Sequence, residues 1–349
     1  MYTIFNLLQG EPGIQQFILC PEKSVLAKMC KEDNAAYFTY TKNKHKLINA
    51  TRRIVQICKQ ENIDVIHVHD SSALNAALLA LNFLPKTVKV VLSRKRNNPI
   101  KERFLNIYKY SHSRIVNIIS VSKAVEAIFD NIIIDKERLL TIYDAIDVAE
   151  FSATESKNLL HKEYDIPEGN LIVGNIAGLT GQKDIITFID TAAEIKKQKP
   201  ADVAITFVII GDGPLKESLI SYAESKGLEK DIVFTGFKNN VKELLPEFDV
   251  MLMTSISEGL PLTIYEAFAS KIPVVSTDAG GIKEVVTNYK TGFVTPQKDY
   301  ERLASHVLEI INDPKLAQTI TENAYTLVKE SHDLSVMKKN YLAFYKSLA

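Results

Sequence analysis

Glu258 and Glu266 are the residues whose type and spacing most directly suggest chemistry. The apolar stretch Val250–Met253 predicts a strand, and Leu262–Ser270 predicts a helix. Glu258 is therefore expected in the connecting loop and Glu266 about one turn into the helix. Because helical side chains tilt toward the N-terminus of their helix, both carboxylates can face one ligand and accept hydrogen bonds from sugar hydroxyls. Each glutamate could also merely complement the helix dipole, and the spacing alone leaves both interpretations open.

The loop between the two glutamates has the residue types of an anion site. Gly259 allows close backbone approach, and Pro261 suits the first position of a helix. The free amides of Leu262 and Thr263 would then point at any anion placed there. A diphosphate would fit this site.

Lys183 is the second candidate. It follows the apolar stretch Leu171–Ala177 and the flexible loop Gly178–Gly181, and it stands at the expected start of a helix. The helix dipole disfavours a cation there, so a bound phosphate would explain the lysine. Compensation by the adjacent Asp184, or a solvated surface lysine, is the alternative.

The turn Gly211–Pro214 superficially resembles a dinucleotide fingerprint. The position of the third glycine holds Lys216, and Pro214 interrupts the loop. The glycine roles of a dinucleotide turn are therefore not all filled, and we interpret the segment as a tight structural turn.

The first half of the chain offers a basic run and a histidine pair. Arg94 and Arg96 follow the apolar stretch Val88–Leu92 and could bind a phosphate or an anionic acceptor, with a solvated basic loop as the alternative. His67 and His69 hint at a metal, but no third ligand is evident. We predict no metal site.

Positioning these residues requires two α/β domains. Short apolar runs alternate with amphipathic stretches, which indicates parallel sheets covered by helices on both faces. The pattern occurs twice, on either side of the polar stretch Ser152–Asn158. The expected strands are Phe17–Cys20, Val65–Val68, Val88–Leu92, Ile115–Val121, Leu139–Ile142, Leu171–Ala177, Ile205–Ile210, Ile232–Thr235, Val250–Met253 and Pro273–Ser276. In such folds ligands bind at the carboxyl ends of the strands.

Composition excludes several classes of protein. The chain has 349 residues, 42 basic and 42 acidic side chains and a formal net charge of zero, so no global charge attracts it to nucleic acid. Three cysteines without metal-type spacing favour a reducing compartment. No uncharged apolar run reaches the roughly 18 residues needed to span a bilayer, and no export signal opens the chain. A cytoplasmic protein is expected.

Several segments together resemble the retaining glycosyltransferases of family 4, which have the GT-B fold of two Rossmann-like domains facing a crevice. The match is strong over Leu171–Phe293 and weaker over Ile63–Phe151 and the final helix Leu334–Leu348. The segments that carry it are Phe207–Leu215 (FVIIGDGPL), Val233–Phe237 (VFTGF), Ser257–Pro261 (SEGLP), Glu266–Ala269 (EAFA) and Val274–Gly281 (VVSTDAGG).

The resemblance implies that the second domain binds a nucleotide-sugar donor, with Lys183 and Glu258 as the catalytic pair. Glu258 would contact hydroxyls of the transferred sugar, Lys183 the diphosphate and Glu266 the ribose. Backbone amides and a cation would stabilise the leaving diphosphate without a metal or another cofactor. The other expected donor contacts are Gly178, Gly236, Phe237, Lys238, Gly259, Leu260, Leu262 and Thr263.

Three departures from the family pattern matter. Gly178 stands where many members carry a phosphate-binding arginine, so Arg94 or Arg96 is expected to supply the missing charge. The run Ser93–Arg96 stands where many members have a first-domain histidine. Asp144–Asp147 (DAID) replaces the usual entry to the interdomain linker, a change expected to be structural.

The expected organisation is an acceptor-side domain over 1–150, a donor-binding domain over 151–331, and a final segment over 332–349 that returns to the first domain. The expected function is hexosyl transfer from a UDP-sugar to a saccharide or lipid-linked saccharide, in the synthesis of cell-surface polysaccharide or glycoconjugate. Peripheral contact with the inner membrane face is also expected, and nucleic acid is not. A nucleotide-sugar epimerase of the same architecture, a dinucleotide-dependent oxidoreductase and a catalytically silent family member are the alternatives.

The N-terminal residues predict a helix where a doubly wound domain would open with a strand. Ile4, Leu7 and Leu8 have helical spacing, and the first expected strand is Phe17–Cys20. On this basis the first domain is expected to lack its opening strand and glycine-rich loop, as in a truncated form with poor stability and little activity. Restoring roughly 15–25 upstream residues would then rescue both.

Overall fold

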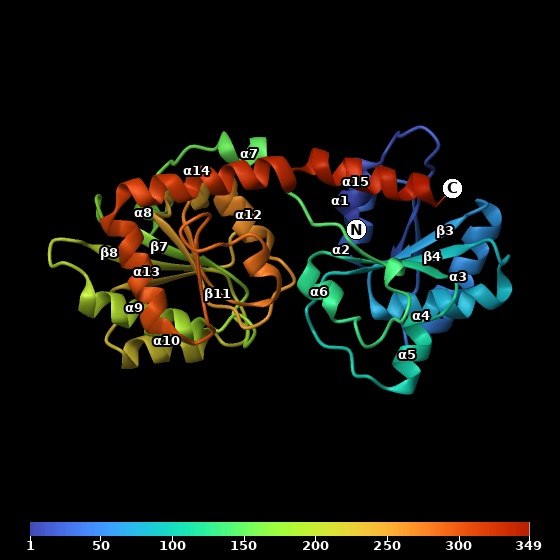
Figure 1. Ribbon diagram of the computed structural model, residues 1–349, viewed down its shortest axis with the longest axis horizontal. Helices are drawn as coiled ribbons and strands as arrows, with labels where there is room; N and C mark the ends of the chain where they lie inside the picture. The colour runs from blue at the N-terminus through green and yellow to red at the C-terminus, as the bar shows by residue number, and fades with distance from the viewer. Residues whose placement is uncertain (349) are drawn as a thin grey trace. The chain divides into compact units, whose positions relative to one another are not determined.

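The computed structural model describes residues 1–348, which form two compact units (Figure 1). Unit 1 comprises Met1–Tyr143 and the C-terminal segment from Met337, and unit 2 comprises Asp144–Val336. The division falls a few residues before the expected boundary at 150, because helix α7 (Val148–Ser152) packs against α12 (Leu262–Ala269) of unit 2.

Unit 2 is built on one six-stranded sheet with the order β12-β11-β10-β7-β8-β9, and all of its pairings are parallel. The strands are β7 Leu171–Ile176, β8 Ile205–Ile210, β9 Ile232–Gly236, β10 Val250–Met253, β11 Val274–Thr277 and β12 Phe293–Thr295. Every residue of β8 and β10 is buried, which explains their unbroken apolar runs. The short β12 was not expected from the sequence.

Helices cover this sheet. Helices α9, α10 and α13 contribute to one apolar core with the strands, and α12 packs against α14 (Figure 1). The remaining bounds in unit 2 are α8 Leu159–Glu163, α9 Ile185–Gln198, α10 Lys216–Ser225, α11 Val241–Leu244, η3 Leu245–Glu247, η4 Gly280–Glu284, α13 Tyr300–Asn312 and α14 Pro314–Ser331.

In unit 1 the strands form two sheets within the described residues. The four-stranded sheet has the parallel order β3-β4-β5-β6, and β1 pairs in parallel with β2. The strands are β1 Ile18–Pro21, β2 Tyr37–Tyr40, β3 Val65–Val68, β4 Lys89–Arg94, β5 Ile115–Ser120 and β6 Leu139–Thr141. The first element is helix α1 (Tyr2–Leu7), as the spacing of its apolar residues predicts.

The helices of unit 1 lie between these strands. They are α2 Val25–Glu32, α3 Lys46–Gln60, α4 Ser71–Ala80, η1 Leu81–Phe83, α5 Phe104–Tyr110, α6 Lys123–Ala127 and η2 Lys136–Arg138. The aromatic strand β2 was missed by sequence reasoning because all four of its residues are half-buried and show no alternation.

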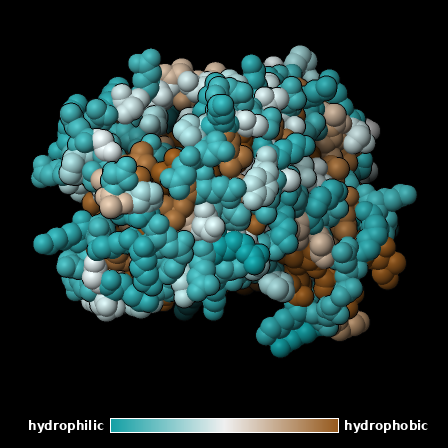
Figure 2. Space-filling model, turned by 60° about the vertical axis from the view of Figure 1, so that its left-hand side comes forward, coloured by the Kyte–Doolittle hydropathy of each residue, from teal (hydrophilic) through white to brown (hydrophobic). Residues whose placement is uncertain are grey.

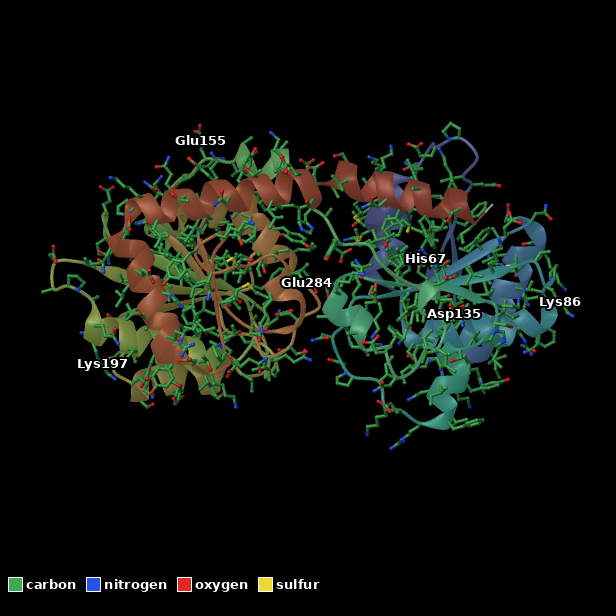
Figure 3. All side chains as sticks on the ribbon, in the orientation of Figure 1. His67, Lys86, Asp135, Glu155, Lys197 and Glu284 are labelled. Carbon is green, nitrogen blue, oxygen red and sulfur yellow. The ribbon has the colours of Figure 1, made fainter. Side chains whose placement is uncertain are left out.

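Helix α15 (Leu334–Ser347) returns to unit 1 from Met337 onward. Its apolar stripe buries Met337 and Tyr341. The Tyr345 hydroxyl lies 2.5 Å from Nδ1 of His67, and Lys338 forms a 2.6 Å ion pair with Glu11. Figure 3 shows His67 beneath this helix.

Three further features concern the described residues as a whole. Among residues 1–348, no helix combines the length and apolar character needed to cross a bilayer. The cysteines Cys20, Cys30 and Cys58 are buried and free. The face drawn in Figure 2 is mostly hydrophilic, with small apolar areas between polar side chains.

A buried glutamate, Glu247, caps helix α8 near the start of unit 2. Glu247 is 6% exposed, and its carboxylate accepts hydrogen bonds from the amides of Leu159 (2.5 Å) and Leu160 (2.9 Å). Nδ1 of His161 lies 3.1 Å from the same carboxylate. Glu247 therefore binds the start of helix α8 from another part of the sequence.

We expect Glu247→Ala to lower the free energy of unfolding by about 2–4 kcal/mol, because it leaves these donors unpartnered in the interior. Glu247→Gln retains an acceptor oxygen and should cost about 1–2 kcal/mol. Urea unfolding measures both changes. Glu229→Ala, at an exposed position of the same unit, is the control, and an equal loss in all three variants would contradict the capping role.

Candidate functional site

The loop after β7 is fixed by the turn after β8. The amide of Leu179 donates to the carbonyl of Asp212 (2.9 Å), and the amide of Leu215 donates to the carbonyl of Leu179 (3.2 Å). A methyl group on Gly213 would lie 2.5 Å from the carbonyl oxygen of Leu179, so only glycine permits this approach. Gly211–Pro214 thus has a packing role in positioning the adjacent loop.

The loop after β10 is tied to the same segment. Oγ1 of Thr254 donates to the carbonyls of Lys183 (3.2 Å) and Asp184 (3.0 Å). The amide of Ile256 donates to the carbonyl of Gln182 (2.9 Å). These bonds align the start of α9 with the loop that carries Glu258, although sequence reasoning did not identify Thr254 or Gln182.

Lys183 and Glu258 meet as a consequence. Nζ of Lys183 lies 2.5 Å from Oε1 of Glu258, and the two side chains are 26% and 12% exposed. The Asp184 carboxylate instead accepts a hydrogen bond from Oγ1 of Thr187 (2.7 Å). Glu258, and not the adjacent Asp184, therefore supplies the negative charge beside the lysine.

Helix α12 begins beside this pair without a side-chain cap. Pro261 is the N-cap and the helix starts at Leu262, as the sequence predicts. The amide of Gly281 donates to the carbonyl of Gly259 (3.0 Å), which ties the loop to the segment after β11. Leu260 is buried and Leu262 is 40% exposed. The first turn of α12 consequently presents backbone amides that no side chain caps.

Thr263 and Glu266, two of the expected donor contacts, lie within the first turn and a half of α12. The hydroxyl of Thr263 points to the sulfur of Met253 (3.9 Å). Glu266 is mostly buried, and burial raises the pKa of its carboxyl above the ordinary value. Within residues 1–348 the Glu266 carboxylate accepts no hydrogen bond, so its acceptor oxygens have no protein donor.

The residues after β9 form a separate group. Gly236 has φ 73°, and its carbonyl accepts a hydrogen bond from the amide of Gly211 (2.9 Å). Phe237 is 76% exposed. The Lys238 ammonium pairs with Glu163 and lies 5.2 Å from the centre of the Tyr164 ring. Lys238 is therefore held by protein contacts, whereas Phe237 presents a free aromatic face.

Lys216 is a candidate that sequence reasoning passed over. A methyl group on Gly236 would lie 3.7 Å from its Nζ, and Lys216 is the first residue of helix α10. Its ammonium makes no ion pair or hydrogen bond with any described residue. The sequence could have indicated Lys216, because a lysine at the expected start of a helix is the same unfavourable placement that made Lys183 a candidate.

Gly178 is exposed and unconfined. The nearest atom to a methyl group placed on it is the carbonyl oxygen of Asp212, at 3.9 Å. The glycine is therefore not required for packing, and a longer side chain would fit.

The basic run of unit 1 lies at the carboxyl end of β4. Arg94 is half-buried, donates to the carbonyl of Asn98 and stands 5.8 Å from the centre of the Phe129 ring. Burial lowers the pKa of its guanidinium from the ordinary value. Arg96 is exposed. Both arginines belong to unit 1, whereas Lys183 and both glutamates belong to unit 2.

His67 has structural partners, whereas Nδ1 of His69 is buried without a hydrogen-bond partner among residues 1–348. Nε2 of His67 lies 2.7 Å from Oγ of Ser93, and Nδ1 faces Tyr345, so both ring nitrogens are engaged. Burial lowers the pKa of His67 to about 3, which keeps the ring neutral. Asp70 caps helix α4 by accepting the amide of Ser72 (2.7 Å). Residues 1–348 contain no cluster of three His, Cys, Asp or Glu side chains able to hold a metal ion.

The segment Asp144–Asp147 is structural. Asp147 caps helix α7 by accepting the amide of Glu150 (3.0 Å), and the amide of Ile146 donates to the carbonyl of His332 (3.1 Å). These bonds join the start of unit 2 to the end of α14.

Comparison with known proteins identifies the class of enzyme. Residues 156–327 match the model of "Glycosyl transferases group 1", and residues 12–150 match "Glycosyltransferase Family 4". An N-acetyl-alpha-D-glucosaminyl L-malate synthase of Bacillus anthracis is 24% identical over 84% of this chain and 77% of its own. An Escherichia coli UDP-Gal:alpha-D-GlcNAc-diphosphoundecaprenol alpha-1,3-galactosyltransferase is 23% identical over 89% of this chain and 84% of its own.

Solved structures show the same fold. A glycosyltransferase from Rickettsia africae superposes with a TM-score of 0.87 at 20% identity, covering 99% of this chain and 93% of its own. The Anabaena protein Alr3699/HepE, in complex with UDP and glucose, gives a TM-score of 0.83 at 19% identity, covering 99% and 95%. With two Rossmann-like units and a glycosyltransferase model matched in each half, the chain belongs to the GT-B glycosyltransferases.

Proposed function

We propose that the protein is a retaining hexosyltransferase that moves a sugar from a UDP-sugar to a saccharide or lipid-linked saccharide acceptor, in the synthesis of cell-surface polysaccharide or glycoconjugate. The observation that carries the proposal is the Lys183–Glu258 pair beside the uncapped start of α12. The Escherichia coli relative is named for a UDP-galactose donor and a diphosphoundecaprenol acceptor, and the Anabaena structure contains UDP and glucose.

The donor would replace the contact between Lys183 and Glu258. On binding, the diphosphate forms an ion pair with the ammonium of Lys183. The Glu258 carboxylate is then free to accept hydrogen bonds from sugar hydroxyls. In the ligand-free protein the ion pair satisfies two partly buried charges that would otherwise be unpaired. The pair therefore holds both groups in place until the donor arrives.

Charge stabilisation drives the reaction. The bond between the sugar's anomeric carbon and the diphosphate oxygen breaks, and negative charge collects on the leaving diphosphate. The free amides of Leu262 and Thr263 at the start of α12 and the Lys183 ammonium stabilise that charge. The acceptor hydroxyl forms the new glycosidic bond on the same face, and its proton passes to the departing phosphate, which balances the transfer with retention.

Lys216 would supply the second cation that Gly178 lacks. Its unpaired ammonium borders Gly236, at the same carboxyl edge of the unit 2 sheet as Lys183. Glu266 would bind the ribose hydroxyls through its free acceptor oxygens, and Phe237 would border the base. This assignment places the whole donor site in unit 2.

Arg94 and Arg96 would bind the acceptor in unit 1. The two relatives described above are named for acceptors with anionic groups, a malate and a diphosphoundecaprenol. A half-buried guanidinium is a planar, permanently charged donor suited to carboxylates and phosphates. An anionic group on the acceptor is therefore the expected ligand of these arginines.

Nucleotide release tests the proposed function. Purified protein is incubated with UDP-glucose, UDP-galactose and their N-acetylated forms, with and without polyprenyl-diphosphate saccharide and malate as acceptors. Acceptor-dependent UDP release with an α-linked product supports the proposal, because a retaining enzyme keeps the α configuration of the donor sugar in its product. Conversion of one UDP-sugar into another without acceptor would identify an epimerase and overturn it.

We expect Lys183→Ala to weaken UDP binding by about 10–100-fold, which corresponds to the loss of a charge-assisted contact. Glu258→Gln should have the opposite effect on UDP, tightening its binding by about 3–10-fold, because the competing carboxylate charge is removed. The same Glu258→Gln change should lower turnover of the UDP-sugar by about 100-fold. Calorimetry and steady-state kinetics measure these changes.

Lys197→Ala provides the matched control. Lys197 pairs with Glu194 at 3.0 Å on the periphery of unit 2, where Figure 3 labels it. Its loss should change neither UDP affinity nor turnover by more than twofold, which is close to experimental error. Near-normal UDP binding by Lys183→Ala would refute the diphosphate assignment.

Gly178→Arg is expected to strengthen donor binding. The position is exposed and open, and the new guanidinium would restore a phosphate ligand. We expect about tenfold tighter UDP binding, measured by calorimetry. Thr180→Arg, also at an exposed position of this loop, is the control for added charge alone. Equal effects of both substitutions would show that position 178 has no specific contact with the phosphates.

The raised pKa of Glu266 predicts a pH-dependent stability. Because the folded protein disfavours the ionised carboxyl, this residue favours folding below its unfolded pKa of about 4.3 and loses that contribution as the pH rises. Glu266→Gln should therefore increase the free energy of unfolding by about 0.5–1 kcal/mol at neutral pH. The gain should disappear near pH 4, and a gain equal at both pH values would contradict the burial of the charge.

A further inference from the structure

Unit 1 contains an open pocket of about 310 Å³ where strand β2 ends and the chain turns into helix α3. Figure 1 shows α3 beside α4 in this unit. We call this hollow the Arg52 pocket, and the side chains that line it carry hydroxyl, amide or guanidinium groups. They include Thr39, Tyr40, Asn43, Asn49, Arg52 and Arg53.

Positive charge surrounds the Arg52 pocket. Between Asn34 and Gln60 the sequence has six basic residues and no acidic residue, although the whole chain has equal numbers of both. The basic residues are Lys42, Lys44, Lys46, Arg52, Arg53 and Lys59. Among residues 1–348 none of these six side chains forms an ion pair. The hydroxyl of Thr41 donates to Glu22 (3.4 Å), but this exposed carboxylate pairs with none of the cations. The positive charge is therefore not compensated within the described chain.

Arg53 is held in place by its own contacts. Its guanidinium lies 5.0 Å from the centre of the Phe38 ring, and Nη1 donates to Oε1 of Gln56 (2.6 Å). Its Nε is buried and has no hydrogen-bond partner within the described residues. Arg52, the preceding residue of α3, is exposed. A guanidinium that is already ordered loses little side-chain entropy when it binds a phosphate or a carboxylate.

The Arg52 pocket also offers neutral donors and acceptors. Nδ2 of Asn49 donates to the carbonyl of Thr41 (3.0 Å) and to Oδ1 of Asn43 (3.2 Å). Oδ1 of Asn49 and Nδ2 of Asn43 therefore remain without hydrogen bonds to any described residue, and so do the hydroxyls of Thr39 and Tyr40. Sugar hydroxyls both donate and accept hydrogen bonds, so they match this mixture of groups.

We propose that the Arg52 pocket binds an anionic saccharide, with a phosphate or carboxylate group at Arg52 and Arg53 and neighbouring sugar hydroxyls at Asn43 and Asn49. A glycan held there would have a raised local concentration at the enzyme. The proposal does not rest on the proposed transferase activity, because binding is measured without donor or turnover.

The pocket is distinct from the residues of the proposed reaction. Lys183 and Glu258 belong to unit 2, whereas β2 and α3 belong to unit 1. The proposed acceptor residues Arg94 and Arg96 follow β4, which is a strand of the other sheet of unit 1. Loss of binding at the Arg52 pocket would therefore leave the assignment of the donor site unaffected.

The lining residues argue against other anionic partners. Proteins bind single-stranded nucleic acid by stacking its bases on aromatic side chains. The Tyr40 ring packs against the core and the Phe38 ring is covered by Arg53, so this pocket offers no free aromatic face. An acidic peptide would pair with the arginines but would bring no array of hydroxyl groups to Asn43 and Asn49. An anionic saccharide satisfies both sets of groups.

Calorimetry with the full-length protein tests the proposal. The probes are tetragalacturonate, glucose 6-phosphate, neutral maltotetraose, inorganic phosphate, oligothymidylate and oligoglutamate. We expect tetragalacturonate or glucose 6-phosphate to bind about tenfold more tightly than maltotetraose and inorganic phosphate. The tighter of the two anionic sugars identifies the charged group as carboxylate or phosphate. Equal affinity for maltotetraose or inorganic phosphate, or tighter binding of oligothymidylate or oligoglutamate, would overturn the proposal.

Arg52→Gln should weaken binding of the anionic sugar about tenfold, because a charge-assisted contact is lost, and should leave UDP affinity unchanged. Lys59→Gln is the matched control, since it removes an exposed cation of the same helix outside the pocket and should change the affinity by less than about twofold. Equal losses in both variants would show that only the net charge matters. Loss of binding in Arg96→Gln would instead place the sugar at the proposed acceptor residues.

Chemical protection tests the pocket without any substitution. Phenylglyoxal modifies accessible guanidinium groups, and mass spectrometry of the resulting peptides gives the rate at each arginine. The bound anionic sugar should slow the modification of Arg52 several-fold, while Arg103, an exposed arginine of the same unit, reacts at an unchanged rate. An unchanged rate at Arg52, or equal slowing at both arginines, would contradict binding in this pocket.

Discussion

The parallel pairing of β7 with β10 is the constraint on which the proposed donor site depends. It aligns Val173 with Val250, and the loops that leave the two strands therefore start side by side at one edge of the sheet. Hydrogen bonds from Thr254 and Ile256 to the start of α9 then hold these loops in register. Lys183 and Glu258, 75 residues apart in the sequence, meet as a result.

The proposed donor site carries free-energy costs that a purely structural region would avoid. A lysine and a glutamate are partly buried against each other, and Glu266 is mostly buried without a hydrogen-bond donor. Burying charges is unfavourable unless their partners compensate the lost hydration. Stability is commonly sacrificed in this way where a ligand supplies the missing contacts. The unpaired ammonium of Lys216 fits the same pattern.

Unit 1 is organised differently, because six basic residues and one acidic residue lie together in its segment from Arg94 to Lys109. His67 is hydrogen-bonded to Ser93 and Tyr345, and Asp70 caps helix α4, so these residues stabilise the sheet and the returning helix α15. The cations that follow β4 have few acidic neighbours in their own segment. The proposed anionic acceptor would place a complementary charge against the same segment.

The sequence by itself determined the two parallel α/β units, because continuous apolar strands can be stable only when both faces are covered. It also made Glu258, Glu266 and Lys183 candidates, since charges at a loop and a helix start are local anomalies. It could not identify β2 or β12, which are too short or too exposed to show a pattern. Only the tertiary structure decided that Lys183 pairs with Glu258 rather than Asp184, and that Glu247 caps α8, because such contacts depend on strand order and loop hydrogen bonds between distant segments.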